Sequence, residues 1–131
     1  MKLDINCVRD ILLTIESINY PVHIPRKEFC SKISSYSEYE IEYCCLKLYE
    51  GNYIMLYIPE GYPTYEARIK IDCIGDLTFQ GHELLEKIRT PENFQMIKKI
   101  GGQIGDFSLT AAKEIGMTLL QSALSSIFPL S

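Results

Sequence analysis

A helix with both ends marked in the sequence, followed at once by a change of hydrophobic period, most constrains this fold. Ser37 and Glu40 have the capping-box spacing that begins a helix, and Gly51 stands where a helix-ending glycine belongs. Residues 53–58 are rich in β-branched and aromatic side chains, and residues 67–72 alternate apolar with polar ones. The two segments predict a β-hairpin after the helix, and therefore a domain of the α+β class.

The residues before this helix predict three further elements. Apolar side chains recur at helical spacing over residues 4–18, Asp4 is placed to cap the first turn, and Pro21 requires that the helix has ended. Residues 20–24 are interpreted as a short strand that a proline closes. Residues 26–36 form either a short helix or an irregular strand, and we favour the helix.

After the hairpin the sequence predicts helices only. Thr78 caps one that runs through Ile88, and Pro91, suited to a first helical position, begins the next. Gly101-Gly102 is interpreted as the break that ends this helix and as a hinge. Residues 106–128 form a long amphipathic helix that is too short and too polar to span a membrane.

The order of these elements is that of a winged helix: helix, short strand, helix, capped helix, hairpin and further helices. We therefore expect a winged-helix-like domain at residues 1–100. A C-terminal amphipathic helical extension at residues 101–131 covers the core or joins two subunits. The 131 residues, with 47% hydrophobic and 23% charged side chains, have the size and composition of a globular chain.

Cysteine usage bears on the cellular compartment. The chain has five cysteines, an odd number with no CxxC pair, and its first residues lack the apolar segment of a secretory signal. We therefore expect a cytoplasmic protein with buried free thiols and without a disulfide framework. The scattered cysteines and histidines predict no metal site, and no motif predicts a cofactor.

The charge of the helix at residues 37–50 decides between two classes of binding partner. The formal net charge of the chain is −4, and this helix carries four glutamates and one lysine. A helix that reads DNA needs cations facing the phosphates, so we expect a non-enzymatic protein that binds another, basic protein rather than DNA. The residues proposed for that contact are Tyr36, Glu38, Tyr39, Glu42 and Tyr43.

Two alternatives stay open. The first is a dimeric DNA-binding transcriptional regulator, with phosphate contacts from Arg26, Lys27, Lys32, Arg68 and Lys70. The second is an enzyme that uses His82 for acid–base chemistry. No Ser, Cys or Asp stands at a motif spacing that completes a nucleophilic set with His82. We therefore expect a packed histidine and name no catalytic residue.

The apolar stripe of the helix at residues 106–128 is too wide to be left in water. It predicts a homodimer contact or a cover for the domain's own core. Small residues four apart in this helix let another helix approach closely. The residues proposed for self-association are Ala112, Ile115, Gly116, Leu119 and Ala123.

Four segments resemble one protein family. They are Met1-Lys2-Leu3-Asp4 with Val8-Arg9-Asp10-Ile11-Leu12-Leu13, then Tyr36-Ser37 with Glu40-Ile41, then Gly51-Asn52-Tyr53-Ile54, and Leu77-Thr78-Phe79-Gln80-Gly81-His82-Glu83-Leu84-Leu85-Glu86-Lys87-Ile88-Arg89. They are similar to phage and prophage proteins of the family known as domain of unknown function 2513, over roughly residues 1–100. Phe94 stands where that family has a tryptophan, and Cys44 lies near a position often held by histidine. The resemblance implies a small protein of a mobile element in a bacterial host cell, and implies no activity.

Overall fold

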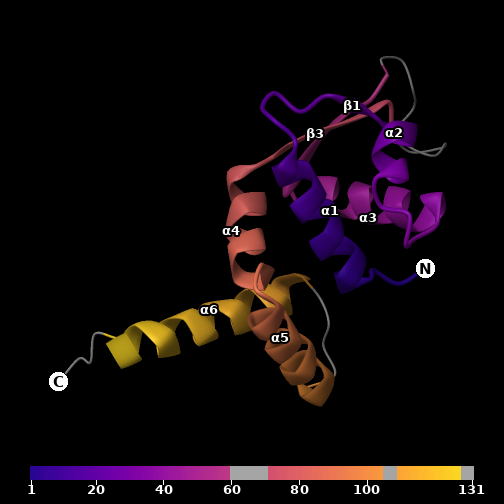
Figure 1. Cartoon of the computed structure of the whole chain (residues 1–131). Helices are drawn as coiled ribbons and strands as arrows, with labels where there is room; N and C mark the ends of the chain where they lie inside the picture. The colour runs from indigo at the N-terminus through magenta and orange to yellow at the C-terminus, as the bar shows by residue number, and fades with distance from the viewer. Residues whose placement is uncertain (60–70, 105–108, 128–131) are drawn as a thin grey trace. The chain divides into compact units, whose positions relative to one another are not determined.

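The computed structural model describes residues 1–59, 71–104 and 109–127, which form six helices and three strands (Figure 1). The α+β class predicted from the sequence is confirmed. In chain order the elements are α1 (Ile5–Ser17), β1 (Ile24–Pro25), α2 (Arg26–Ser31), α3 (Glu38–Glu50), β2 (Ile54–Tyr57), β3 (Cys73–Leu77), α4 (Phe79–Ile88), α5 (Pro91–Ile104) and α6 (Leu109–Ile127).

The chain divides into two compact units, Met1–His82 and Glu83–Ser131, with the boundary inside α4. In the first unit α3 packs against α1 and α2, and all three helices contact strands (Figure 1). Its core is made of aliphatic and aromatic side chains from each of these elements. Fully buried members include Phe29, Ile11, Leu12, Ile15, Ile41, Leu48, Ile54 and Ile74.

The first two helices of this unit follow the predictions. An Asp4 carboxylate oxygen accepts a hydrogen bond from the backbone N–H of Asn6 at 2.9 Å, which satisfies a free donor at the start of α1. Residues 26–31 form the helix that we favoured for the next segment, α2, and bury Phe29 and Cys30.

The C-terminal end of α3 is a Schellman motif centred on a residue other than the predicted glycine. The N–H of Tyr53 donates to the carbonyl of Leu48 at 2.8 Å, and the N–H of Asn52 donates to the carbonyl of Tyr49 at 3.0 Å. Asn52, with φ of 64°, holds the left-handed position, whereas φ of Gly51 is −79°. Glycine is required at position 51 for a steric reason, because a Cβ there would lie 2.7 Å from the Tyr53 ring.

The sheet has the strand order β1-β3-β2, with both pairings antiparallel. β2 and β3 pair as the predicted hairpin, but β3 spans Cys73–Leu77, beyond the predicted residues 67–72, and residues 71 and 72 are not in a strand. The central strand pairs on both sides and buries Cys73, Ile74, Gly75 and Leu77, so it lacks the alternation of a half-exposed strand. The first strand is also shorter than predicted, because only Ile24 and Pro25 pair with β3. Residues 60–70 lie outside the described residues.

Thr78 ties the start of α4 to the corner between α3 and β2. Its hydroxyl accepts from the N–H of Gly81 at 3.0 Å, the predicted cap, and donates to the carbonyl of Asn52 at 2.6 Å. Its backbone N–H donates to the carbonyl of Tyr53 at 3.0 Å. A Cβ at Gly81 would fall on that same Tyr53 carbonyl oxygen. Threonine and glycine at these two places therefore let α4 begin directly beside the β2 strand.

In the second unit, α5 packs against α6. Thr90 caps α5 by accepting from the N–H of Asn93 at 3.2 Å. The predicted break at Gly101-Gly102 is wrong, because α5 continues through both glycines to Ile104. Each glycine costs a helix only about 1 kcal/mol relative to alanine, and packing of α5 compensates for such a loss. No described helix is long and apolar enough to cross a membrane.

Candidate functional site

The outward face of α3 carries an apolar stripe of its own. Ile41, Cys44, Cys45 and Leu48 form the buried face, as predicted. With about 100° between successive residues, Tyr39, Tyr43 and Leu46 fall on the opposite side of the helix at spacing i, i+4 and i+7. Tyr39 is 63% exposed, and Tyr43 and Leu46 are half-buried. A helix that only covered a core would place polar side chains along this line.

A shallow hollow of about 220 Å³ opens along this stripe. It is lined by Met1, Tyr39, Glu42, Tyr43 and Leu46. The exposed Met1 extends the apolar part of the lining beyond the helix itself. Sequence reasoning found three of these residues and missed Met1 and Leu46. The helical spacing of Leu46 from Tyr39 and Tyr43 was the available signal, whereas nothing local places Met1 beside α3.

Carboxylates surround the stripe, and the two cations beside them are engaged. Glu38, Glu40 and Glu50 are exposed, and Glu42 is half-buried. Lys47 pairs with Glu50 at 3.0 Å, and this contact raises the pKa of Lys47.

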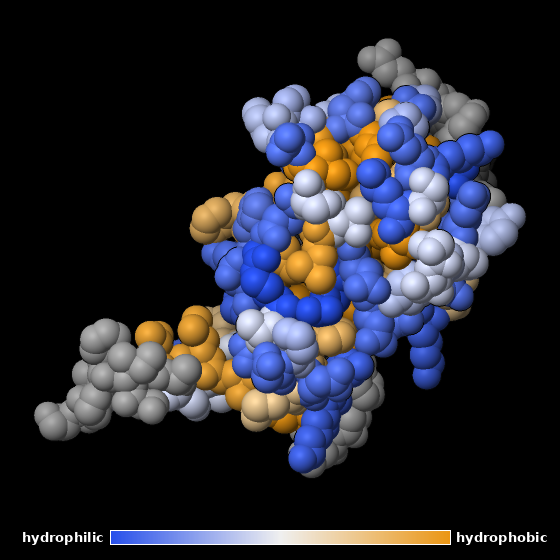
Figure 2. Space-filling view, in the orientation of Figure 1, coloured by the Kyte–Doolittle hydropathy of each residue, from blue (hydrophilic) through white to orange (hydrophobic). Residues whose placement is uncertain are grey.

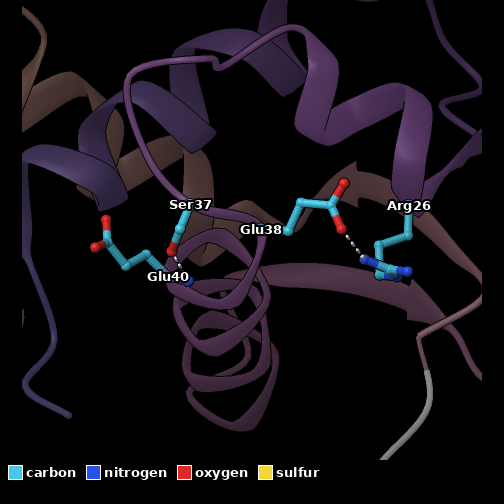
Figure 3. Close-up of polar contacts among 4 residues, drawn as sticks. All are labelled: Arg26, Ser37, Glu38 and Glu40. Atoms are coloured by element: carbon cyan, nitrogen blue, oxygen red, sulfur yellow. Dashed lines mark hydrogen bonds and ion pairs between the residues drawn. The ribbon is translucent and has the colours of Figure 1, made fainter.

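Figure 3 shows Arg26 of α2 reaching Glu38, with a nitrogen–oxygen distance of 3.5 Å. It also shows the Ser37 hydroxyl on the backbone nitrogen of Glu40, at 3.2 Å, while the Glu40 carboxylate points away. Only the Ser37 half of the predicted capping box is therefore formed. The Glu40 carboxylate is left on the acidic outer surface.

Tyr36 has a different role from the other two predicted tyrosines. Its hydroxyl donates to a carboxylate oxygen of Asp10 in α1 at 2.9 Å. Burial and the Asp10 carboxylate raise the pKa of Tyr36 above its ordinary value. The residue is half-buried and does not line the hollow, so it fixes the segment before α3 to α1.

The family model described as "Hypothetical protein (DUF2513)" matches residues 2–105. The chain belongs to this family. The resemblance found in the sequence is thereby confirmed. Comparison with curated proteins and with solved structures finds no match.

The cations proposed for DNA contact in this DUF2513 chain have different surroundings. Arg26 is paired with Glu38, and its side chain is 26% exposed. Lys27 of α2 and Lys32 beyond it are exposed. Arg68 and Lys70 lie outside the described residues.

The prediction of a packed His82 is wrong, because the side chain is exposed. In α4 the buried face passes through Gly81, Leu84, Leu85 and Ile88, which leaves position 82 on the outer side of the helix. The sequence identifies the helix but not how far around it the burial extends. His82 instead lines a separate hollow of the unit Met1–His82.

All five thiols are free and buried. A hydrogen bond with Cys44 of α3, together with burial, raises the pKa of Cys7 of α1, and burial raises the pKa of Cys45. Cys7 and Cys45 therefore stay protonated and unreactive. The hydrogen bond with Cys7 lowers the pKa of Cys44, whose thiol is also buried. Among the described residues, no three His, Cys, Asp or Glu side chains are grouped to hold a metal ion.

The residues proposed for self-association lie on α6 in this family member. Gly116 is buried, and a Cβ there would lie 2.7 Å from the Cβ of Lys87 in α4. Ile115 and Leu119 are half-buried, and the side chains of Ala112 and Ala123 lie outside the described residues. Figure 2 shows hydrophobic, orange surface along α6. The exposed apolar side chains of α6 include Met117, Leu120 and Leu124.

Proposed function

We propose that this DUF2513 protein is a non-enzymatic, winged-helix-like protein that binds another protein through the outer surface of α3. The element order α1-β1-α2-α3-β2-β3, with the short first strand joined to the hairpin in one sheet, supports the winged-helix part. In that arrangement α3 holds the position of the element that enters a DNA groove. Its surface chemistry therefore determines the class of partner.

The observation that carries the proposal is the apolar stripe Tyr39-Tyr43-Leu46 inside a ring of carboxylates. Tyrosines and an aliphatic side chain supply contact area at the centre of a protein interface, and charges at its rim steer a complementary partner. The same carboxylates repel phosphate oxygens, and both neighbouring cations already pair with glutamates of α3. The partner is therefore a protein with a basic surface.

A capture experiment with a DNA titration tests this proposal. The tagged chain is incubated with bacterial lysate, and captured proteins are compared between wild type, Tyr39→Ala and the control Phe79→Ala. Phe79 is an exposed aromatic residue of α4 that lines neither hollow. We expect one basic protein to be retained by wild type and Phe79→Ala, released by added salt, and bound about tenfold less by Tyr39→Ala.

The DNA alternative gives the opposite pattern. Fluorescence anisotropy with labelled duplex DNA would then show binding that weakens steeply with salt and disappears in Lys27→Glu. That result, or equal capture of the protein by wild type and Tyr39→Ala, contradicts the proposal.

The proposal includes self-association through α6. Exposed Met117, Leu120 and Leu124 recur at spacing i, i+3 and i+7, which places them on one side of the helix. No charged residue follows Glu114 in the chain, so this surface has no electrostatic preference for a foreign partner. A second copy of the same helix presents a matching apolar surface.

A further inference from the structure

A second hollow lies in the unit Met1–His82, away from the residues of the α3 surface. Its volume is about 520 Å³, within the range of small-ligand and side-chain binding pockets. It is formed by the end of α1, the loop that follows, the two hairpin strands and the first turn of α4. The lining residues are Ile15, Glu16, Ile18, Asn19, Tyr20, Val22, Met55, Asp76, Leu77 and His82.

The charge of this hollow is negative. Asp76 of β3 is half-buried, and its Oδ1 accepts a hydrogen bond from the backbone N–H of Val22 at 3.1 Å. Within the described part of the chain, no Lys or Arg pairs with Asp76 and none lines the hollow. The C-terminal end of α1 adds the negative end of a helix dipole.

Most of the remaining lining is apolar or aromatic, and Asn19 and His82 add polar side chains. Ile15, Val22 and Leu77 are buried, and the exposed Tyr20 and Met55 complete the lining. A bound group therefore needs a cationic tip for Asp76 and an apolar stem for these walls. Guanidinium suits this combination better than ammonium, because it is more weakly hydrated, stacks on aromatic faces and offers several donors in one plane.

We propose that this hollow binds an arginine side chain presented by a partner peptide, with Asp76 as the principal ionic contact. The guanidinium lies against the free edge of the Asp76 carboxylate while Oδ1 keeps its bond to Val22. The site is separate from the outer surface of α3, so the proposal goes beyond the function proposed above. It gives the chain a second place at which a basic segment docks.

The test is an NMR titration of the ¹⁵N-labelled full chain with three capped tripeptides, Gly-Arg-Gly, Gly-Lys-Gly and Gly-citrulline-Gly. Citrulline keeps the shape of arginine and removes its charge. We expect saturable shifts of the Val22, Met55 and Asp76 amides with the arginine peptide only. Asp76→Asn keeps an oxygen acceptor for the N–H of Val22 and removes the charge. We therefore expect this variant to bind the arginine peptide at least about tenfold more weakly than wild type does.

Asp72→Asn is the matched control, since Asp72 directly precedes β3, is exposed and does not line the hollow. It is expected to bind the arginine peptide as wild type does. The proposal is overturned if the citrulline peptide or the lysine peptide binds as tightly as the arginine peptide. It is also overturned if Asp76→Asn binds the arginine peptide with the affinity of wild type. Tyr39 does not line this hollow, so Tyr39→Ala is expected to bind the arginine peptide as wild type does. Measuring that binding distinguishes a failure of the arginine site from a failure of the proposed α3 interface.

Discussion

Tyr36 contributes to this protein through one polar contact, between the segment before α3 and helix α1. Its hydroxyl donates to Asp10 at 2.9 Å in a half-buried setting. A hydrogen bond to a carboxylate is worth roughly 1.5–3 kcal/mol, and burial of the ring adds to that. The contact also places Ser37 at the start of α3, where its hydroxyl caps the helix.

The raised pKa of Tyr36 predicts a pH dependence. The folded state keeps the phenol proton, whereas the unfolded chain loses it as the pH rises past the ordinary value of 10.0. This contribution is therefore fully present below pH 10.0 and is lost above it. In urea unfolding at a series of pH values, we expect Tyr36→Phe to be less stable at neutral pH and to lose less stability in alkali than wild type.

Tyr20→Phe is the control, because that side chain is 85% exposed. The buried thiols also titrate in alkali, but they are common to all three proteins and cancel in the comparison. Parallel alkaline slopes for wild type and Tyr36→Phe would contradict the role given to the Tyr36–Asp10 contact.

At single residues, the sequence predicts what local geometry decides. Asp4, Ser37 and Thr78 cap helices as expected, because a cap depends on residues two or three positions away. The position of His82 was wrong, because its exposure depends on which side of α4 is covered. Met1 was missed at the α3 hollow for the same reason, since only the tertiary fold brings it there.

Helix α3 is defined at its C-terminal end by a backbone conformation rather than by its last side chain. Asn52 has φ of 64°, a region that asparagine tolerates and glycine occupies without strain. The Thr78 hydroxyl bonds to the carbonyl of Asn52 at 2.6 Å, so this residue also connects the helix end to α4. The conformation of one residue therefore aligns two elements.

Substitutions at Asn52 are expected to act in opposite directions. Asn52→Gly relieves the left-handed backbone. We therefore expect the free energy of unfolding either to rise or to fall by no more than about 0.5 kcal/mol. Asn52→Ala places a Cβ in a disfavoured conformation and costs about 1–2 kcal/mol. Thermal and urea unfolding measure both variants. An alanine variant as stable as the glycine variant would contradict the Schellman geometry.

Whole elements were predicted best where hydrophobic period and caps agree. α1, α3, α4 and the start of α5 follow their sequence signals. β3 was misplaced because a central strand is buried on both faces and shows no alternation. The glycine pair at 101 and 102 was misread because propensity gives way to packing within α5.

On the scale of the molecule, the exposed apolar surface of α6 needs a cover. Met117, Leu120 and Leu124 are each about half exposed, in a chain with no charged residue after Glu114. Apolar groups repeated on one side of a helix mark an association surface when they are left in water. The self-association proposed above would provide that cover.

A charge placed in this surface is expected to separate the subunits. Leu120→Glu puts a carboxylate at the centre of the apolar stripe, where its burial in a dimer would be costly. Light scattering during size-exclusion chromatography should give a dimer for wild type and a monomer for Leu120→Glu. Ser122→Glu, also exposed on α6 but off the stripe, should remain dimeric. A monomeric wild type, or a dimeric Leu120→Glu, would rule out this contact.

The burial of every cysteine thiol determines when this protein can be alkylated. Cysteines that are buried in the folded protein react with iodoacetamide only in molecules that have opened. Three of the five lie in α1 and α3, at the centre of the first unit, and none lies in the second. Alkylation therefore records the opening of residues 1–82 alone, and mass spectrometry of the modified peptides distinguishes loss of the helices from loss of the strand that holds Cys73.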